Sequence, residues 1–131
     1  MMKRLFYPAI FTKEGSLYWV RFPDLDGCFT QGETIEEAYE NAQEAVGLWM
    51  DNGNGEFNPP QASDLSEIHV SENESIVLIE FDPVDYLKRT GSQSVKKTLT
   101  IPAWLNTLGE QNNINFSNLL QNALKDKLNV S

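Results

Sequence analysis

Residues 22–49 read FPDLDGCFTQGETIEEAYENAQEAVGLW, and the second half of this stretch decides the fold. From Ile35 onward the apolar residues recur at the i, i+3, i+4, i+7 spacing of one helix face for about four turns: Ile35, Ala38, Tyr39, Ala42, Ala45, Val46, Trp49 and Met50. Thr34 is predicted to cap this helix, and Glu37 completes a capping box with it. Residues 51–53 (DNG) predict where the helix ends.

Three short antiparallel strands are predicted before this helix. Residues 4–11 are apolar and aromatic, but Pro8 cannot donate to a ladder, so this strand is expected at a sheet edge or with a bulge. A hairpin turn at residues 13–16 leads into residues 17–22, whose side chains alternate between two faces. Residues 28–31 follow the turn PDLDG as a third strand. Three strands followed by a helix predict a sheet with one covered face.

A fourth strand is predicted well after the helix. Residues 51–64 are rich in Asn, Gly and Pro and read as an irregular loop. Residues 76–81 (IVLIEF) form an apolar run of strand length, which predicts a strand in the middle of the sheet. Residues 83–88 predict one helical turn. The first domain, residues 1–89, is therefore expected to be an α+β fold of β-β-β-α-β order.

The charge distribution separates two parts of the chain, which meet at a linker predicted over residues 90–93. Residues 1–90 carry 17 acidic and 6 basic side chains, a net charge of −11, whereas residues 91–131 have a net charge of +2. An acidic body disfavours nucleic acid and attracts a basic protein, while a mildly basic tail can approach phosphate. The asymmetry indicates two different kinds of partner.

Composition narrows the class of protein. An apolar content of 40% with 14 aromatic residues is enough for a core. The apolar runs are far shorter than the about 20 residues of a membrane span, and no signal-peptide pattern is present, so the cytoplasm is the expected location. One Cys and one His are too few for a structural zinc site, and no metal or cofactor is expected. Cys28 is expected to be buried, His69 to lie at the surface, and Trp19 and Trp49 to lie in the core.

The second domain, residues 94–131, combines one strand with two short helices. Residues 96–101 (KKTLTI) alternate between a polar and an apolar side. Pro102 suits the first position of a helix whose apolar face holds Trp104, Leu105 and Leu108. Ser117 is predicted to cap a second helix that buries Leu120, Ala123, Leu124 and Leu128. One strand and two helices cannot bury this much apolar surface alone, so a second copy of the chain is required.

Two such strands, one from each copy, can pair into an antiparallel ribbon that fits the major groove of B-DNA. Lys96, Thr98 and Thr100 would then face the bases, because Lys can donate to guanine and Thr can bond either way or touch a thymine methyl. Ser117 and Asn118, at the start of the second helix, would offer free amides to a phosphate. The alternative is a plain dimerisation module whose Lys and Thr side chains are solvated, and the residues alone leave both interpretations open.

A family resemblance joins the two halves. FPDLDGC followed by TQGETIEEAYENAQEA resembles the HicB family of antitoxins over residues 4–83, and the N-terminal domain of that family is an incomplete ribonuclease-H-like fold. The tail, KKTLTIPAWL and NFSNLLQNAL, resembles the ribbon-helix-helix domain of many HicB proteins, in which the residues matching Lys96, Thr98 and Thr100 read DNA. The resemblance implies a type II antitoxin that blocks a small basic HicA toxin, an mRNA-cleaving ribonuclease, and represses its own operon.

Two residues depart from the ribbon-helix-helix pattern. Asn115 stands where Gly is frequent, although Asn tolerates the left-handed conformation. Lys97 lies on the inward side of the ribbon, where its stem can pack while its ammonium group reaches water. Neither change breaks the pattern. The implied assembly is a homodimer through the C-terminal domain, and a tetramer through the N-terminal domain stays open.

Five acidic residues are the candidate contacts to the toxin: Asp24, Asp26, Glu33, Glu36 and Glu40. The alternative function is a metal-dependent nuclease with a ribonuclease-H-like site at Asp24 and Asp26. Such chemistry needs several converging carboxylates to hold two Mg²⁺ ions, whereas these two acids share one turn and the others are expected on a loop or on the solvent face of the helix. We therefore expect a binding protein without catalytic residues.

Overall fold

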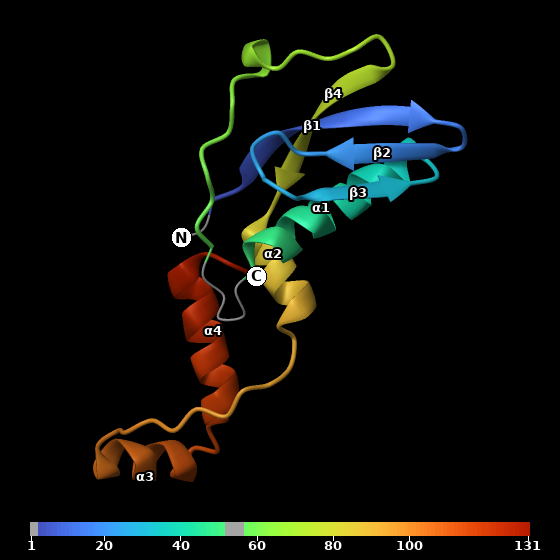
Figure 1. Ribbon diagram of the computed structural model, residues 1–131. Helices are drawn as coiled ribbons and strands as arrows, with labels where there is room; N and C mark the ends of the chain where they lie inside the picture. Colours follow the sequence, from blue (N-terminus) through green and yellow to red (C-terminus); the bar gives the residue numbers. More distant parts are fainter. Residues whose placement is uncertain (1–2, 52–56) are drawn as a thin grey trace. The chain divides into compact units, whose positions relative to one another are not determined.

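The computed structural model describes residues 3–51 and 57–131, which form two compact units that divide between Ser92 and Gln93. Each unit is a fold of its own (Figure 1). Among the described residues, no helix is long and apolar enough to cross a membrane. The stop signal at Asn52 and Gly53, and part of the loop predicted over residues 51–64, fall outside the described residues.

The first unit is a four-stranded antiparallel sheet with two α-helices and a short 3₁₀ helix. Its elements in chain order are β1 (Leu5–Glu14), β2 (Leu17–Arg21), β3 (Phe29–Gly32), α1 (Ile35–Met50), η1 (Leu65–Glu67), β4 (Glu74–Phe81) and α2 (Pro83–Thr90). The strands lie in the order β3-β2-β1-β4, and every neighbouring pair is antiparallel. The predicted mixture of strands and helices, in the order β-β-β-α-β, is confirmed.

Helix α1 packs against β2, β3 and β4 and covers one face of the sheet (Figure 1). The alternation of each strand sends one set of side chains under this helix. The largest fully buried side chains of the unit are Tyr7, Tyr86, Phe81, Leu25, Ile79, Val20 and Val46 together with Pro8. From α1 itself, Ala38, Ala42, Val46 and Met50 enter the core. The apolar face predicted from helical spacing is therefore buried along its middle, whereas Ile35 and Trp49 of that predicted face are exposed.

The start of α1 is fixed by its cap and by close contact with β3. The Thr34 hydroxyl accepts a hydrogen bond from the Glu37 amide at 3.0 Å, so the predicted N-cap is confirmed. Gly32, the last residue of β3, lies directly against the helix backbone: a Cβ atom there would be 2.4 Å from the Ala38 nitrogen. The absence of a side chain at Gly32 is what lets α1 pack this closely.

The predicted places of the first and fourth strands in the sheet are wrong. β1 is central, because it pairs with β2 from Ile10 onward and with β4 along its length. Pro8 is nevertheless accommodated, since β2 does not reach it. β4 is an edge strand: its apolar run is long because Val77 and Ile79 lie on the α1 side, while Ile76 and Leu78 lie on the opposite, open face of the sheet.

Two tryptophans expected in the core lie at the surface. Trp19 is 42% exposed on the open face, and Trp49 is 40% exposed at the last turn of α1, where its indole N–H donates to the Asp26 carbonyl oxygen at 2.8 Å. Both residues belong to apolar patterns in the sequence. However, α1 covers only one face of the sheet, and Trp19 lies on the other face. Cys28 is buried and His69 is exposed, as predicted. Residues 83–88 belong to a helix longer than the single turn predicted, because α2 continues to Thr90.

The second unit holds α3 (Ala103–Gln111) and α4 (Phe116–Leu128). Residues 96–101, the predicted strand, form no β-strand pair with any other described residue of the chain. No residue from 93 to 131 is buried. Pro102 is the N-cap of α3 rather than its first helical residue. The cap of α4 is Asn115 and not Ser117, because the Asn115 side chain accepts from the Asn118 amide. In the turn between α3 and α4, the left-handed residue is Asn113, with φ of 56°, whereas Asn115 has φ of −83°.

Substitution of Gly32 by Ala is expected to lower the free energy of unfolding by about 1–3 kcal/mol, because the new methyl group would overlap the backbone of α1. The measurement is urea unfolding followed by circular dichroism at one protein concentration. Gln31→Ala, at an exposed position of the same strand, is the control and should change stability by no more than about 0.5 kcal/mol. Equal stability of Gly32→Ala and the parent would contradict the role of this contact.

Candidate functional site

The turn between β2 and β3 is closed by three backbone hydrogen bonds. Leu25 donates to the Phe22 carbonyl at 3.3 Å, Cys28 donates to the Leu25 carbonyl at 3.0 Å, and Phe22 donates to the Cys28 carbonyl at 3.3 Å. Leu25 is fully buried, and Gly27 takes the positive φ of 78° that reverses the chain. Burial also raises the pKa of the Cys28 thiol to about 11, which makes the thiol an inert apolar group at neutral pH.

The two acids of this turn have different surroundings. Asp24 is half-buried, and both of its carboxylate oxygens accept hydrogen bonds from Ser63: the amide donates to Oδ2 at 2.9 Å and the hydroxyl to Oδ1 at 2.5 Å. Asp26 is exposed. Asp24 therefore holds the loop after α1 against the turn. Among the described residues, no group of three His, Cys, Asp or Glu side chains is placed to hold a metal ion.

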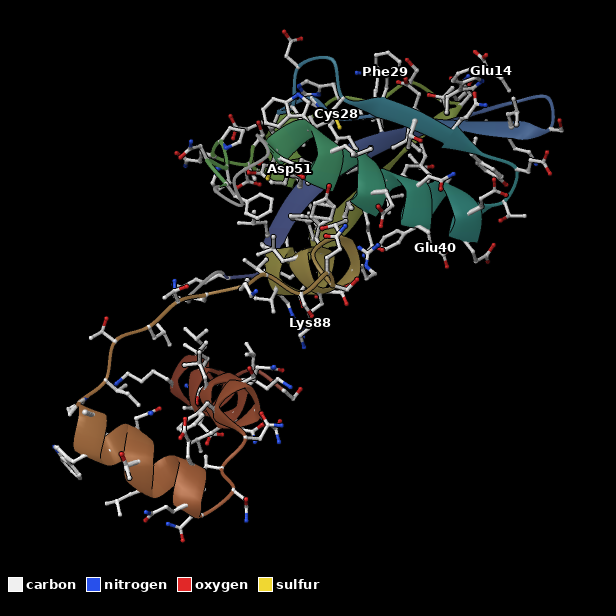
Figure 2. The ribbon with its side chains drawn as sticks, turned by 90° about the horizontal axis from the view of Figure 1, so that it is seen from below. Glu14, Cys28, Phe29, Glu40, Asp51 and Lys88 are labelled. Carbon is white, nitrogen blue, oxygen red and sulfur yellow. The ribbon has the colours of Figure 1, made fainter. Side chains whose placement is uncertain are left out.

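The other predicted toxin-facing acids lie at the surface of the first unit. Glu33 follows β3, Glu36 is in the first turn of α1 and Glu40 lies one turn further, and all three are exposed. Glu40 projects outward from α1 in Figure 2. Glu44, next along the helix, instead pairs with Arg89 of α2. Four of the five predicted acids are thus accessible, and Asp24 is the one whose oxygens are already engaged.

Sequence reasoning missed the apolar residues at the margin of this unit. Phe29 and Leu48 are each 70% exposed, and Phe29 lies at the surface beside the buried Cys28 (Figure 2). The signal was available for Phe29: successive strand residues point to opposite faces, so a buried Cys28 places Phe29 on the other side. The helical periodicity of α1 likewise places Leu48 off the apolar face.

The second unit has an apolar and a polar side, as the alternation of residues 96–101 predicts. Lys97, Leu99 and Ile101 line a hollow of about 470 Å³ together with Phe116, Leu119, Leu120 and Ala123 of α4. Lys96, Thr98 and Thr100 are exposed and lie outside this lining. The structure therefore separates the two sets of side chains that the sequence separates.

The start of α4 differs from the predicted phosphate site in one respect. Ser117 and Asn118 lie in the first turn of α4, and both are exposed. The Asn118 amide donates to the Asn115 side chain at 3.0 Å, so it is not the free amide that was expected. Ser117 also lines the apolar hollow, next to Phe116.

These features define a class of protein: a folded acidic unit joined to a small helical unit that leaves its apolar side uncovered. The chain belongs to the HicB-like antitoxins of bacterial toxin–antitoxin systems, because the model of that family matches residues 7–123. The family implies a toxin as partner.

Individual proteins are similar to this chain in sequence or in fold. A chain of a toxin–antitoxin complex from Streptococcus pneumoniae is 30% identical and superposes with a TM-score of 0.59 over 95% of this chain and 99% of that chain. The antitoxin HicB of Burkholderia pseudomallei has the same fold, with 24% identity and a TM-score of 0.52 over 95% of this chain and 97% of that chain. An uncharacterised 14.9 kDa protein of Haemophilus phage HP1 is 29% identical over 103 residues, which cover 77% of this chain and 76% of the relative.

Ser63→Ala is expected to lower the free energy of unfolding by about 1–2 kcal/mol, because it removes a hydrogen bond to a half-buried carboxylate. Asp24→Ala should cost more, since it also leaves the Ser63 amide unpaired. In a double-mutant cycle by urea unfolding, the two changes should couple by about 1 kcal/mol or more. Asp26→Ala, an exposed acid of the same turn, serves as the control with little effect. Strict additivity of Ser63→Ala and Asp24→Ala would show that this contact does not form.

Proposed function

We propose that the chain is an antitoxin that binds and neutralises a HicA-type mRNA interferase and represses its own operon through a dimeric ribbon-helix-helix. The observation that carries the proposal is the membership of the HicB-like antitoxins, found on a chain with two chemically different units. The first unit is acidic and has its own hydrophobic core. The other is mildly basic and leaves its apolar side uncovered. One function is assigned to each.

The acidic unit is the toxin-binding part. Residues 1–90 carry a net charge of −11, which would steer a small basic toxin toward this surface. Asp26, Glu33, Glu36 and Glu40 are exposed and available for contact. Asp24 contributes by shaping the loop through Ser63 rather than by a direct contact.

The second unit is the DNA-binding part. Leu99 and Ile101 point into the apolar hollow, so a second copy that covers this side would place two strands next to each other. Lys96, Thr98 and Thr100 would then form the outer surface of the ribbon, in the positions that enter a major groove. The first turn of α4, with Ser117 and Asn118, would lie near the phosphates.

The assembly follows from these two parts. Residues 94–131 make the homodimer, and contact between the N-terminal units of two dimers would give a tetramer suited to a palindromic operator. The lone, buried Cys28 needs no oxidising compartment, which supports a cytoplasmic location.

The toxin-binding part is tested with the cognate HicA-type toxin, purified separately. The purified chain is expected to bind it and to stop its cleavage of mRNA, measured by calorimetry and by an RNA-cleavage assay. Binding should weaken as salt is raised, because the attraction between the two charged surfaces is screened. The nuclease alternative would be correct instead if the chain alone cleaved RNA or DNA with Mg²⁺ and lost this activity on Asp24→Asn.

The DNA-binding part is tested with Lys96→Ala. Loss of one base or phosphate contact should weaken operator binding by about 1–3 kcal/mol per contact, while toxin neutralisation is unchanged. The measurement is a titration of operator DNA by fluorescence anisotropy at fixed salt. Lys127→Ala, which removes the same charge from the last turn of α4, is the matched control. Equal operator affinity of Lys96→Ala and the parent would show that the ribbon is assigned to the wrong residues.

A further inference from the structure

An exposed apolar ridge surrounds the edge strand β3. We define the Phe29 ridge as Trp19, Phe29, Leu48 and Trp49, which are 40–70% exposed. Phe29 is the first residue of β3, and it pairs with Arg21 of β2 on one side only, since β3 is the last strand of the sheet. Large apolar side chains that gather at one margin of a folded unit indicate a contact surface.

The ridge is flanked by two hollows, and Phe29 lines both. On the open face of the sheet, a hollow of about 310 Å³ is lined by Ile10, Trp19 and Phe29. On the helix side, a hollow of about 300 Å³ is lined by Phe29, Ala45, Leu48 and Trp49. The two hollows can each receive side chains of a partner, so Phe29 would lie between them at the centre of the contact.

The surroundings of the ridge are acidic. Asp26 precedes Phe29 by three residues, and its carbonyl oxygen is held by the Trp49 indole. Glu33 follows the end of β3 and is exposed. Glu44, one helical turn before Leu48, is paired with Arg89 of α2. Arg21 lines the hollow on the open face of the sheet, and its guanidinium group is paired with Glu74 at 3.2 Å. A partner that fits this surface therefore carries apolar side chains with basic residues around them.

We propose that the Phe29 ridge is the main contact through which the first unit binds its basic toxin. This inference rests on the proposed antitoxin function and names the surface that performs it. Protein interfaces concentrate binding free energy in a few aromatic and apolar side chains at the centre, with charged residues at the rim. A second copy of this chain fits the ridge poorly, because two acidic rims would repel each other. Asp26 and Glu33, two of the acids predicted from the sequence, belong to the rim, and the ridge supplies the affinity.

The test measures the affinity of three full-length variants for the cognate HicA-type toxin, made inactive so that it can be purified. Phe29→Ala and Leu48→Ala lie on different elements, and each should weaken toxin binding by about tenfold or more. Leu78→Ala is the matched control, because Leu78 is exposed on the same open face but belongs to β4 at the opposite edge of the sheet. Its affinity should equal that of the parent. All three positions are exposed, so thermal unfolding and operator binding should be unchanged.

The outcomes separate the ridge from the proposed function. Weaker binding by Phe29→Ala and Leu48→Ala, with Leu78→Ala unchanged, supports the ridge. Equal toxin affinity of all variants and the parent overturns the ridge and leaves the antitoxin function standing. A parent chain that does not bind the toxin at all overturns both. If Phe29→Ala changes the mass of the free chain in sedimentation but not its toxin affinity, the ridge is a contact between copies and the inference is wrong.

Discussion

The apolar side of residues 93–131 is not covered within one chain. Leu99, Ile101 and Trp104 are exposed, as are most apolar residues of α4, and no residue of this unit is buried. Each large apolar side chain that leaves water contributes about 1.5–3 kcal/mol, so a unit with none buried lacks the main source of folding free energy. We propose that a second copy supplies the missing surface. The proposed dimer, its paired ribbon and the outward place of Lys96 all depend on this one requirement.

The first unit has the opposite character, because it is complete in itself. Helix α1 is capped by Thr34 and lies against Gly32, and the Asp24–Ser63 hydrogen bonds fasten the following loop to the turn. Among the described residues, no polar or charged residue is buried. The proposed toxin contacts, the Phe29 ridge and the acidic rim, therefore all lie at the surface. In this proposal, the chain combines a unit with a complete core and a unit that association completes.

The parts of the fold that could be predicted from the sequence are the local ones. The spacing of apolar residues and the Thr34 cap specify α1, because both act within a few residues along the chain. The order of strands could not be predicted, since the pairing of β1 with β4 joins residues about 70 positions apart, such as Phe6 and Glu80. The role of Asp24 was hidden for the same reason: its partner, Ser63, lies on a distant loop. Asn115 and Ser117 are both good capping residues, and only backbone geometry selects Asn115.

The most direct test of the account is the mass of the intact chain by sedimentation velocity over a range of micromolar concentrations. One chain has a mass of 14.9 kDa. We expect species of two chains, or of a multiple of two, with α3 and α4 formed. Dilution to the monomer should be accompanied by loss of their helical circular dichroism signal, because folding and association of residues 93–131 are coupled. A stable monomer that keeps both helices would contradict the claim that a second copy completes this unit.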